Sequence, residues 1–384
     1  MDSHYSYLID LGIMLLAASV GGMISKKLKQ PEVLGQILVG IVLGMGILRP
    51  TEFTSHLAEI GVIFLMFIAG LETDVSEFRE SGKSSSMVAL GGIVFPLAMV
   101  AGAVYLITDD LVVSIFMGVV STATSVSISV QTLREMNQLR SRQGVTILGS
   151  AIIDDIVGIL LLTALIGFVS PESGGSLLLV GGKILLFFLI TLLVGFTIIK
   201  LVKNYEVQFN PEERVVTYAI IICFGLAFLS EEMGVAAITG AYFTGVVFSM
   251  TSQRHRVVHN INRIANIMFT PLFFVSIGMG VDIFGAFSAI GIGSVIIVFS
   301  ILGKIFGSGL GALLSGYNLD ESLQVGIGMV PRAEVAIIIA NLGFRLGLIG
   351  QGELGAVILM VLVTTLSTPA LLKWSFSRTI KDRA

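Results

Sequence analysis

The stretch AIIDDIVGILLL, residues 151–162, places two adjacent aspartates, Asp154 and Asp155, in a run that is otherwise apolar. The fold depends on whether this run lies in a soluble core or in a bilayer. Of the 384 residues, 54% are hydrophobic and only 13% are charged, whereas a soluble domain carries about 25% charged residues. Mean hydropathy is +0.95. The composition therefore predicts an integral membrane protein with both aspartates at membrane depth.

The composition also limits what else the chain contains. Eight prolines, no Gly/Ser-rich linker and no long polar segment predict one membrane unit without a second domain. A net charge of −3 gives no indication of nucleic-acid binding. The single cysteine, Cys223, lies in an apolar run, which predicts a buried, inert thiol and no intrachain disulfide.

Thirteen apolar runs are candidates for crossing about 30 Å of hydrocarbon. These are residues 5–25, 32–48, 55–72, 85–107, 111–131, 144–170, 176–202, 213–230, 236–250, 264–281, 286–314, 321–342 and 352–373. The first run follows Asp2 and His4 rather than a basic stretch, so we expect a true helix and not a cleaved signal peptide. The sequence therefore predicts an all-α polytopic protein in the lipid bilayer.

The basic residues indicate the orientation of these helices. With the N-terminus outside, 18 lysines and arginines lie at inner ends and only Arg49 and Arg345 lie outside. Lys183, Lys304 and Arg332 fall inside the runs. The positive-inside rule then predicts a cytoplasmic C-terminus in a multi-pass protein of the cell membrane.

A division of thirteen helices into six, one and six predicts inverted repeats, because the first and eighth helices then run in opposite directions. In transporters built this way, interrupted helices at corresponding positions form the substrate site. The fifth run contains the hydroxyl-rich STATSVSISV, residues 121–130, and the twelfth contains GIGMVPRAEV, residues 326–335. We expect both helices to be broken there.

Four helices are expected to bring polar or charged side chains near the middle of the membrane. At 1.5 Å per residue, Asp154 and Lys304 each lie roughly 15 Å from the inner end of their runs, Arg332 about 16 Å and Thr124 about 10 Å. A charged side chain at a helix centre costs about 2.5–3.5 kcal/mol on insertion scales. We therefore expect these buried charged residues to have a role that compensates for this cost.

The role of these buried charges is either structural or functional. Asp154 and Lys304 could form a buried ion pair that locks two helices, and Arg332 and Glu334 could do the same within the twelfth run. One lysine neutralises only one carboxylate, however, and adjacent helical residues point about 100° apart. Asp155 is then expected to face elsewhere with its own charge.

A carboxylate among hydroxyls and backbone carbonyls offers only oxygen ligands, which suit a hard cation such as Na⁺ as well as a proton. If the two exclude each other at Asp155, each lowers the affinity of the other by the same factor. A carrier that moves only when one of them is bound then exchanges them across the membrane. The residues therefore predict an antiporter rather than an enzyme, with the cation and H⁺ as substrates and no cofactor.

Four segments carry a resemblance to a known family. These are QPEVLGQILVGIVLG (30–44), FLMFIAGLETD (64–74), the Asp-Asp pair and PLFFVSIGMGVD (271–282). In order and spacing they resemble the monovalent cation/proton antiporter superfamily, in the branch of the Kef potassium efflux systems and the NapA and GerN sodium/proton antiporters. The Asp-Asp pair is most similar to the electrogenic NapA and GerN type.

The resemblance implies an NhaA/NapA-like fold with two crossed broken helices, elevator-type transport and a homodimer. Its implied parts are scaffold and dimerisation helices in 1–84 and 206–284, core helices in 85–170 and 285–384, and a linker helix in 171–205. Its implied ion and proton site consists of Asp155 as the ion ligand, Asp154 paired with Lys304, and the broken-helix hydroxyls of Thr124 and Ser125. Arg332 and Glu334 have a supporting role by the same resemblance.

Kef proteins carry Gln before the key Asp and add a cytosolic nucleotide-binding domain. This chain has Asp154 there, and its tail stops soon after Lys373. Both departures favour an ungated, electrogenic exchanger in which a protonatable Lys304 helps to move more than one proton per cation. A K⁺/H⁺ antiporter or Kef-type K⁺ efflux protein, and an organic-anion symporter of similar fold, are the alternatives.

Other features allow two interpretations. Ser150, four residues before Asp154, either donates to its carboxylate or serves helix packing. His255 and His259 have the spacing of metal ligands and the side chain of a pH sensor, but a basic inner loop explains them more simply. A glycine face beside Lys304 indicates close helix packing; it consists of Gly303, Gly307 and Gly311.

Two rival classes fit less well. An intramembrane aspartyl protease needs two aspartates that share a proton across two helices, which neighbours on one helix do not do easily. A potassium channel needs a ring of carbonyls, and the sequence contains no repeated filter string.

Overall fold

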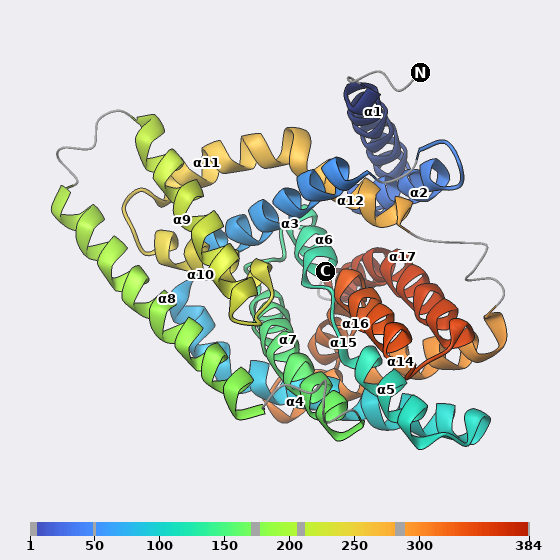
Figure 1. Ribbon diagram of the computed structural model, residues 1–384. Coiled ribbons are helices and arrows are strands. Elements are labelled where there is room, and N and C mark those ends of the chain that lie inside the picture. The colour runs from blue at the N-terminus through green and yellow to red at the C-terminus, as the bar shows by residue number, and fades with distance from the viewer. Residues whose placement is uncertain (1–5, 49–50, 170–176, 206–211, 281–288, 383–384) are drawn as a thin grey trace.

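The computed structural model describes residues 6–48, 51–169, 177–205, 212–280 and 289–382, and in these ranges every regular element is a helix (Figure 1). The elements are α1 Ser6–Lys27, α2 Glu32–Gly44, α3 Glu52–Glu72, α4 Val75–Thr108, α5 Leu111–Thr122, α6 Val126–Glu135, α7 Arg142–Val169, α8 Leu177–Tyr205, α9 Glu212–Glu232, α10 Ala237–Ser249, α11 Arg254–Ile264, the π-helical turn η1 Ala265–Phe269, α12 Thr270–Met279, α14 Ile290–Leu314, α15 Leu319–Gly328, α16 Glu334–Arg345 and α17 Gln351–Asp382.

Ten helical segments in the described ranges are long and apolar enough to cross a membrane, which confirms the predicted all-helical membrane protein. Three shorter apolar helices, Glu32–Gly44, Ala237–Ser249 and Val335–Phe344, fall below that length. Every predicted run contains helix. Because three of these helices are short, the count of thirteen crossings and the inverted repeats stay predictions.

The chain interrupts two helices where the sequence predicts breaks. The first break, residues 123–125, separates α5 from α6, and the second, residues 329–333, separates α15 from α16. Pro331 lacks a backbone donor and disfavours helix at the residue before it. The first half of each broken helix, α5 and α15, is capped at its N-terminus by Asp110 and Asn318 respectively, whose side chains accept from backbone N–H groups.

Packing sorts most helices into two bundles (Figure 1). We call α4–α7 with α14–α17 the site bundle, and α1–α3 with α9–α12 the second bundle. Contacts are extensive within each and sparse between them, where α6 meets α2 and α3, and α17 meets α2. The long helix α8 touches members of both.

The tightest packing in the site bundle joins α4 and α14 through glycines. A Cβ added to Gly307 would lie 2.2 Å from the carbonyl oxygen of Gly91, and one added to Gly311 would lie 2.4 Å from that of Met87. At Gly303 the nearest atom is Cα of Pro96, at 2.7 Å. The three predicted glycines thus serve close backbone approach, as small residues do between membrane helices.

Three boundaries differ from the prediction because hydropathy alone does not detect polar or amphipathic turns. α4 begins at Val75, so the predicted limit between residues 84 and 85 falls inside a helix. The predicted basic loop around His255 and His259 is helix α11, which buries Val257 and Ile261 and exposes both histidines. α17 continues to Asp382, nine residues beyond Lys373.

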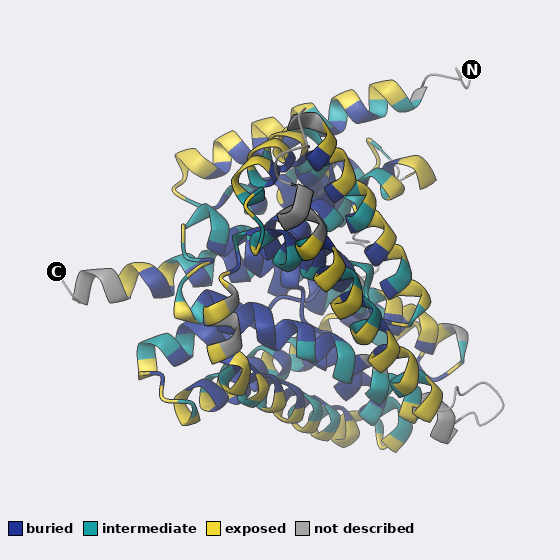
Figure 2. Ribbon diagram, turned by 90° about the vertical axis from the view of Figure 1, so that its left-hand side faces the viewer, coloured by how far each residue is buried: buried dark blue, intermediate teal, exposed yellow. Residues whose placement is uncertain are grey.

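The burial pattern agrees with a membrane environment. Figure 2 shows exposed residues along the outer faces of helices around the whole bundle, with buried residues at the centre. Many of the exposed residues are large and apolar, such as Leu178, Leu185 and Phe196 on α8. Cys223 is fully buried, as expected for an inert thiol.

Candidate functional site

The two helix breaks meet inside the site bundle. The backbone N–H of Ser125 in the first break donates to the carbonyl oxygen of Pro331 in the second, with the two atoms 2.6 Å apart. One turn further along α6, the Ser129 hydroxyl donates to the carbonyl oxygen of Gly328 at 2.5 Å. The side chains of neither Ser125 nor Ala333 cap the helix that follows. The breaks therefore bring the starts of α6 and α16, which lack a side-chain cap, together at one buried place.

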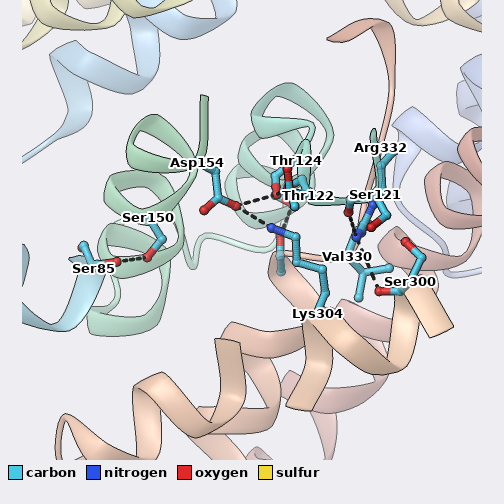
Figure 3. Close-up of polar contacts among 12 residues, drawn as sticks. Ser85, Ser121, Thr122, Thr124, Ser150, Asp154, Ser300, Lys304, Val330 and Arg332 are labelled. Atoms are coloured by element: carbon cyan, nitrogen blue, oxygen red, sulfur yellow. Dashed lines mark hydrogen bonds and ion pairs between the residues drawn. The ribbon is translucent and has the colours of Figure 1, made fainter. Parts of the chain in front are cut away.

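Asp154 and Lys304 form an ion pair at this junction (Figure 3). Lys304 Nζ on α14 lies 2.5 Å from Oδ2 of Asp154 on α7, and both side chains are 0% exposed. The Thr124 hydroxyl in the first break donates to the same Oδ2 at 2.9 Å. The predicted pairing is present, and it connects the first break to both charges.

Asp155 adds a second buried carboxylate, with 6% of the residue exposed. It belongs to the same turn of α7, and its charge acts on Lys304. Because neighbours on a helix point about 100° apart, the two carboxylates face different directions. Two acids and one amine are thus gathered beside the first break.

Arg332 is the fourth buried charge, with 0% exposure, and it lies in the second break. Its guanidinium donates to three backbone carbonyls: to Val330, to Ser121 at 2.7 Å and to Ser300 at 3.4 Å. Val330 and Ser121 lie at or near the carboxyl ends of α15 and α5, where the helix dipole places negative charge. Arg332 therefore stabilises the two helix ends by satisfying their carbonyls.

The remaining predicted residues differ in position. Ser125 is buried, and its hydroxyl pairs with that of Ser127 at 3.1 Å. Ser150 donates to the carbonyls of Thr146 and Ser85, at 2.7 and 3.0 Å, so its hydroxyl packs α7 against α4 and has no contact with Asp154 among the described residues. The side chain of Glu334 lies outside those described, so its pairing with Arg332 stays a prediction.

Two hydroxyls that support the second break were missed from the sequence. Thr364 on α17 accepts from the backbone N–H of Arg332 at 3.2 Å, and Thr365 donates to its carbonyl at 2.6 Å. Two adjacent threonines in an apolar run were a usable signal. They hold the main chain of Arg332 in its non-helical conformation.

A cavity of about 690 Å³ lies between the two bundles, at the end where Arg134 and Arg140 gather. It is lined by residues of α2, α3, α6 and α12. The carboxylate of Glu135 on α6 accepts from the N–H groups of Glu32 and Val33 at the start of α2, at 2.5 and 3.3 Å. Next to it, the guanidinium Nε of Arg134 lies 3.7 Å from the carboxylate of Glu72 on α3. These contacts join the bundles at that end.

With all four groups ionised, the charges of Asp154, Asp155, Lys304 and Arg332 sum to zero. Carboxylate, hydroxyl and carbonyl oxygens around the first break are ligands that suit a small hard cation. The geometry thus provides an enclosed, electroneutral place with oxygen ligands and titratable groups.

A family model described as "Sodium/hydrogen exchanger, transmembrane" matches residues 14–376. Among curated proteins, the chain is similar to the probable Na⁺/H⁺ antiporter GerT of Bacillus cereus, with 40% identity over 96% of this chain and 99% of the relative. It is 37% identical to the Na⁺/H⁺-K⁺ antiporter GerN of Bacillus cereus, over 99% and 98% of the two chains. It is 35% identical to an Na⁺/H⁺ antiporter of Enterococcus hirae, over 95% and 96%.

Two solved structures have a similar fold. One, from an electron-microscopy map of the sodium proton antiporter MjNhaP1 of Methanocaldococcus jannaschii, has a TM-score of 0.72 with 99% of this chain and 98% of that chain covered. Another structure of MjNhaP1, at pH 8, has a TM-score of 0.65 with 96% of both chains covered. Both are 18% identical in sequence, so they establish the fold alone.

Proposed function

Because this chain belongs to the sodium/hydrogen exchanger family, we propose that it is a secondary transporter that exchanges a monovalent cation, Na⁺ first, for protons. The observation that carries the proposal is the buried Asp154–Lys304 pair at the junction of two broken helices, with Asp155 beside it. A buried ion pair contributes little to net stability. Its position at a polar junction inside a membrane bundle is better explained by ion transport.

Competition between cation and proton follows from the charge of the site. The four ionised groups sum to zero, so one bound cation or one bound proton leaves a single excess positive charge. Both together leave two, in a medium of low dielectric constant where like charges repel strongly. The site therefore holds one or the other, and each displaces its competitor. This is the condition for exchange.

We assign roles to the individual side chains on this basis. Asp155 binds the cation, assisted by the hydroxyls of Thr124 and Ser125 and by carbonyls of the first break. Asp154 holds Lys304 when no cation is bound. Arg332 keeps the two helix ends together, with support from Glu334 on α16 and, through the packing of α7 on α4, from Ser150. The cation and proton are the substrates, and no cofactor is assigned.

Lys304 makes the exchange electrogenic in this proposal. A cation at Asp155 repels the ammonium group, and Lys304 is held by one carboxylate oxygen that it shares with Thr124. Lys304 then leaves Asp154 and loses a proton. Two protons, one from each of Asp155 and Lys304, are released for each cation, so one net charge moves per cycle.

Alternating access is assigned to sliding of the site bundle against the second bundle, the latter forming the scaffold and the interface of a homodimer. The sparse contacts between bundles and the cavity between them support this division. Thirteen crossings, inverted repeats, an external N-terminus and a cell-membrane location complete the proposal. In that orientation the cavity opens to the cytoplasm.

K⁺ is the second candidate for the transported cation. A relative of 37% identity carries K⁺ in its name beside Na⁺ and H⁺. The organic-anion alternative has no such support among the named relatives.

The test uses purified protein in proteoliposomes with a trapped pH indicator, to which Na⁺, Li⁺ or K⁺ is added in turn. We expect Na⁺ to release protons from acidified vesicles, and Asp155→Asn to reduce the rate at least a hundredfold while the variant keeps its thermal unfolding profile. The amide keeps the shape of the carboxylate and removes its charge. Folded Asp155→Asn with wild-type exchange would refute the site assignment, and a folded wild type that no cation activates would refute antiport.

A further inference from the structure

Gly92 on α4 differs from the other glycines at the α4–α14 contact. A Cβ on Gly91, Gly303 or Gly307 would meet backbone atoms of the opposite helix first. A Cβ on Gly92 would meet only side-chain atoms of α14: Ser308 Oγ at 2.4 Å and Lys304 Nζ at 3.3 Å. Close backbone approach explains the first three glycines. It does not explain Gly92, where the absence of a side chain instead lets a hydroxyl and an amine of α14 approach.

Ser308 lies one helical turn after Lys304 and is 0% exposed. A serine inside a helix commonly donates to the carbonyl four residues earlier, but among the described residues the Ser308 hydroxyl has no hydrogen-bond partner. A buried hydroxyl without a partner costs free energy. The Ser308 hydroxyl and Lys304 Nζ both border the position that a Cβ on Gly92 would take, although no hydrogen bond joins them.

Lys304 needs a second partner in the cycle proposed above. Its ammonium group carries three donors, and within the described ranges its hydrogen bond goes to Asp154 Oδ2 alone. When a cation occupies the carboxylates, the side chain leaves Asp154 inside a fully buried site, where an unpartnered amine is costly. A serine hydroxyl both donates and accepts, so it can partner a lysine in either protonation state.

We propose that the Ser308 hydroxyl, which the absence of a side chain at Gly92 leaves accessible to Lys304, is an alternative hydrogen-bond partner for the Lys304 amine, engaged when a cation is bound at the carboxylates. The proposal rests on the exchange function proposed above. Ser308 acts as a positioning residue: it touches neither cation nor carboxylate, and it stabilises the state in which Lys304 has left Asp154. Without the Ser308 hydroxyl, Lys304 stays on Asp154 more often and competes more strongly with the cation for the carboxylates.

The test compares Ser308→Ala with Ser300→Ala in proteoliposomes. Ser300 lies one turn before Lys304 on the same helix and is also a buried hydroxyl without a partner among the described residues, and its substitution leaves its backbone carbonyl in place. We expect Ser308→Ala to raise the cation concentration for half-maximal exchange at least fivefold and to shift the pH profile of exchange to higher pH. Ser300→Ala should stay within twofold of wild type with an unchanged profile.

Gly92→Ala provides a second variant, because a methyl group there would lie against both Ser308 Oγ and Lys304 Nζ. We expect the same direction of change, together with a smaller rise in unfolding temperature on addition of cation, since a ligand stabilises the state that binds it. If Ser308→Ala and Gly92→Ala both behave as Ser300→Ala does, the alternative partner is wrong although exchange stands. If wild type itself does not exchange, the proposed function fails first.

Discussion

Two positively charged side chains of the site, Lys304 and Arg332, are fully buried, but their hydrogen-bond partners are chemically different. Among the described residues Lys304 has one hydrogen-bond partner, a carboxylate oxygen that also accepts from Thr124. Arg332 has three backbone carbonyls as partners, and its own main chain is held by Thr364 and Thr365. A carboxylate can exchange its partner for a proton or a cation, whereas a backbone carbonyl cannot be titrated.

Burial alone therefore does not identify the side chain that works in transport. Both residues are 0% exposed, and both would be costly without partners. In our proposal the chemistry of the hydrogen-bond partners separates the two residues, because a carboxylate partner makes Lys304 exchangeable and carbonyl partners make Arg332 a fixed support. Substitutions at the two positions should consequently affect different measurements.

The largest effect in this comparison is expected at Arg332. Arg332→Met leaves carbonyls at two helix ends without their charged donor, which should lower the free energy of unfolding by about 3–5 kcal/mol. The measurement is thermal unfolding in detergent. Arg332→Lys should recover only part of the loss, because an ammonium lacks the planar fork with which the guanidinium reaches three carbonyls. A Met variant with the wild-type unfolding temperature would show that the hydrogen bonds of the Arg332 guanidinium do not stabilise the fold.

Lys304→Gln should change transport more than stability. The amide still donates a hydrogen bond to Asp154, but it carries no proton to release, so we expect exchange without net charge movement. The measurement is Na⁺-driven proton flux at several membrane potentials set by K⁺ and valinomycin. Retention of wild-type voltage dependence in an active variant would contradict the role given to Lys304.

Thr124→Ala tests the second hydrogen bond to Asp154 Oδ2, beside that of Lys304, with a smaller expected effect. It removes one hydrogen bond to Asp154 Oδ2, worth about 1 kcal/mol. We therefore expect the apparent cation affinity to fall roughly fivefold. Thr124→Ser keeps the hydroxyl and should remain close to wild type. Equal affinities for the Ala and Ser variants would exclude the hydroxyl from the site.

The smallest effect is expected from the histidines of α11. His255 and His259 lie on the exposed face of that helix, away from the buried charges. Replacing both with alanine should leave the pH profile of exchange unchanged in proteoliposomes, whereas a displaced profile would make α11 a pH sensor after all.

Much of this site was predictable because its parts have strong local signals. The hydroxyl-rich stretch before residue 130 and Pro331 indicate the two breaks, and matching depths indicate the pairing of Asp154 with Lys304. Helix α11 was missed because its apolar residues are too few for a hydropathy window, although the two that are buried, Val257 and Ile261, have helical spacing.

Other contacts have no local signal. The partners of Arg332 are main-chain carbonyls up to 211 residues away, and every residue type offers the same carbonyl. Only the helix packing determines which ones a guanidinium reaches. The approach of Ser308 and Lys304 to Gly92 is likewise set by how α4 and α14 are rotated against each other, and the sequence contains no record of that rotation.

The hydrogen bond between the two breaks has a consequence for how sequences of this kind can vary. Its donor is the main-chain N–H of Ser125 and its acceptor is the main-chain carbonyl of Pro331. Neither group belongs to a side chain, so at position 125 only substitution by proline removes the donor, and at position 331 no substitution removes the acceptor. Mutation can therefore alter the proposed oxygen ligands one at a time, and with them the preferred ion, while the hydrogen bond between the half-helices is kept.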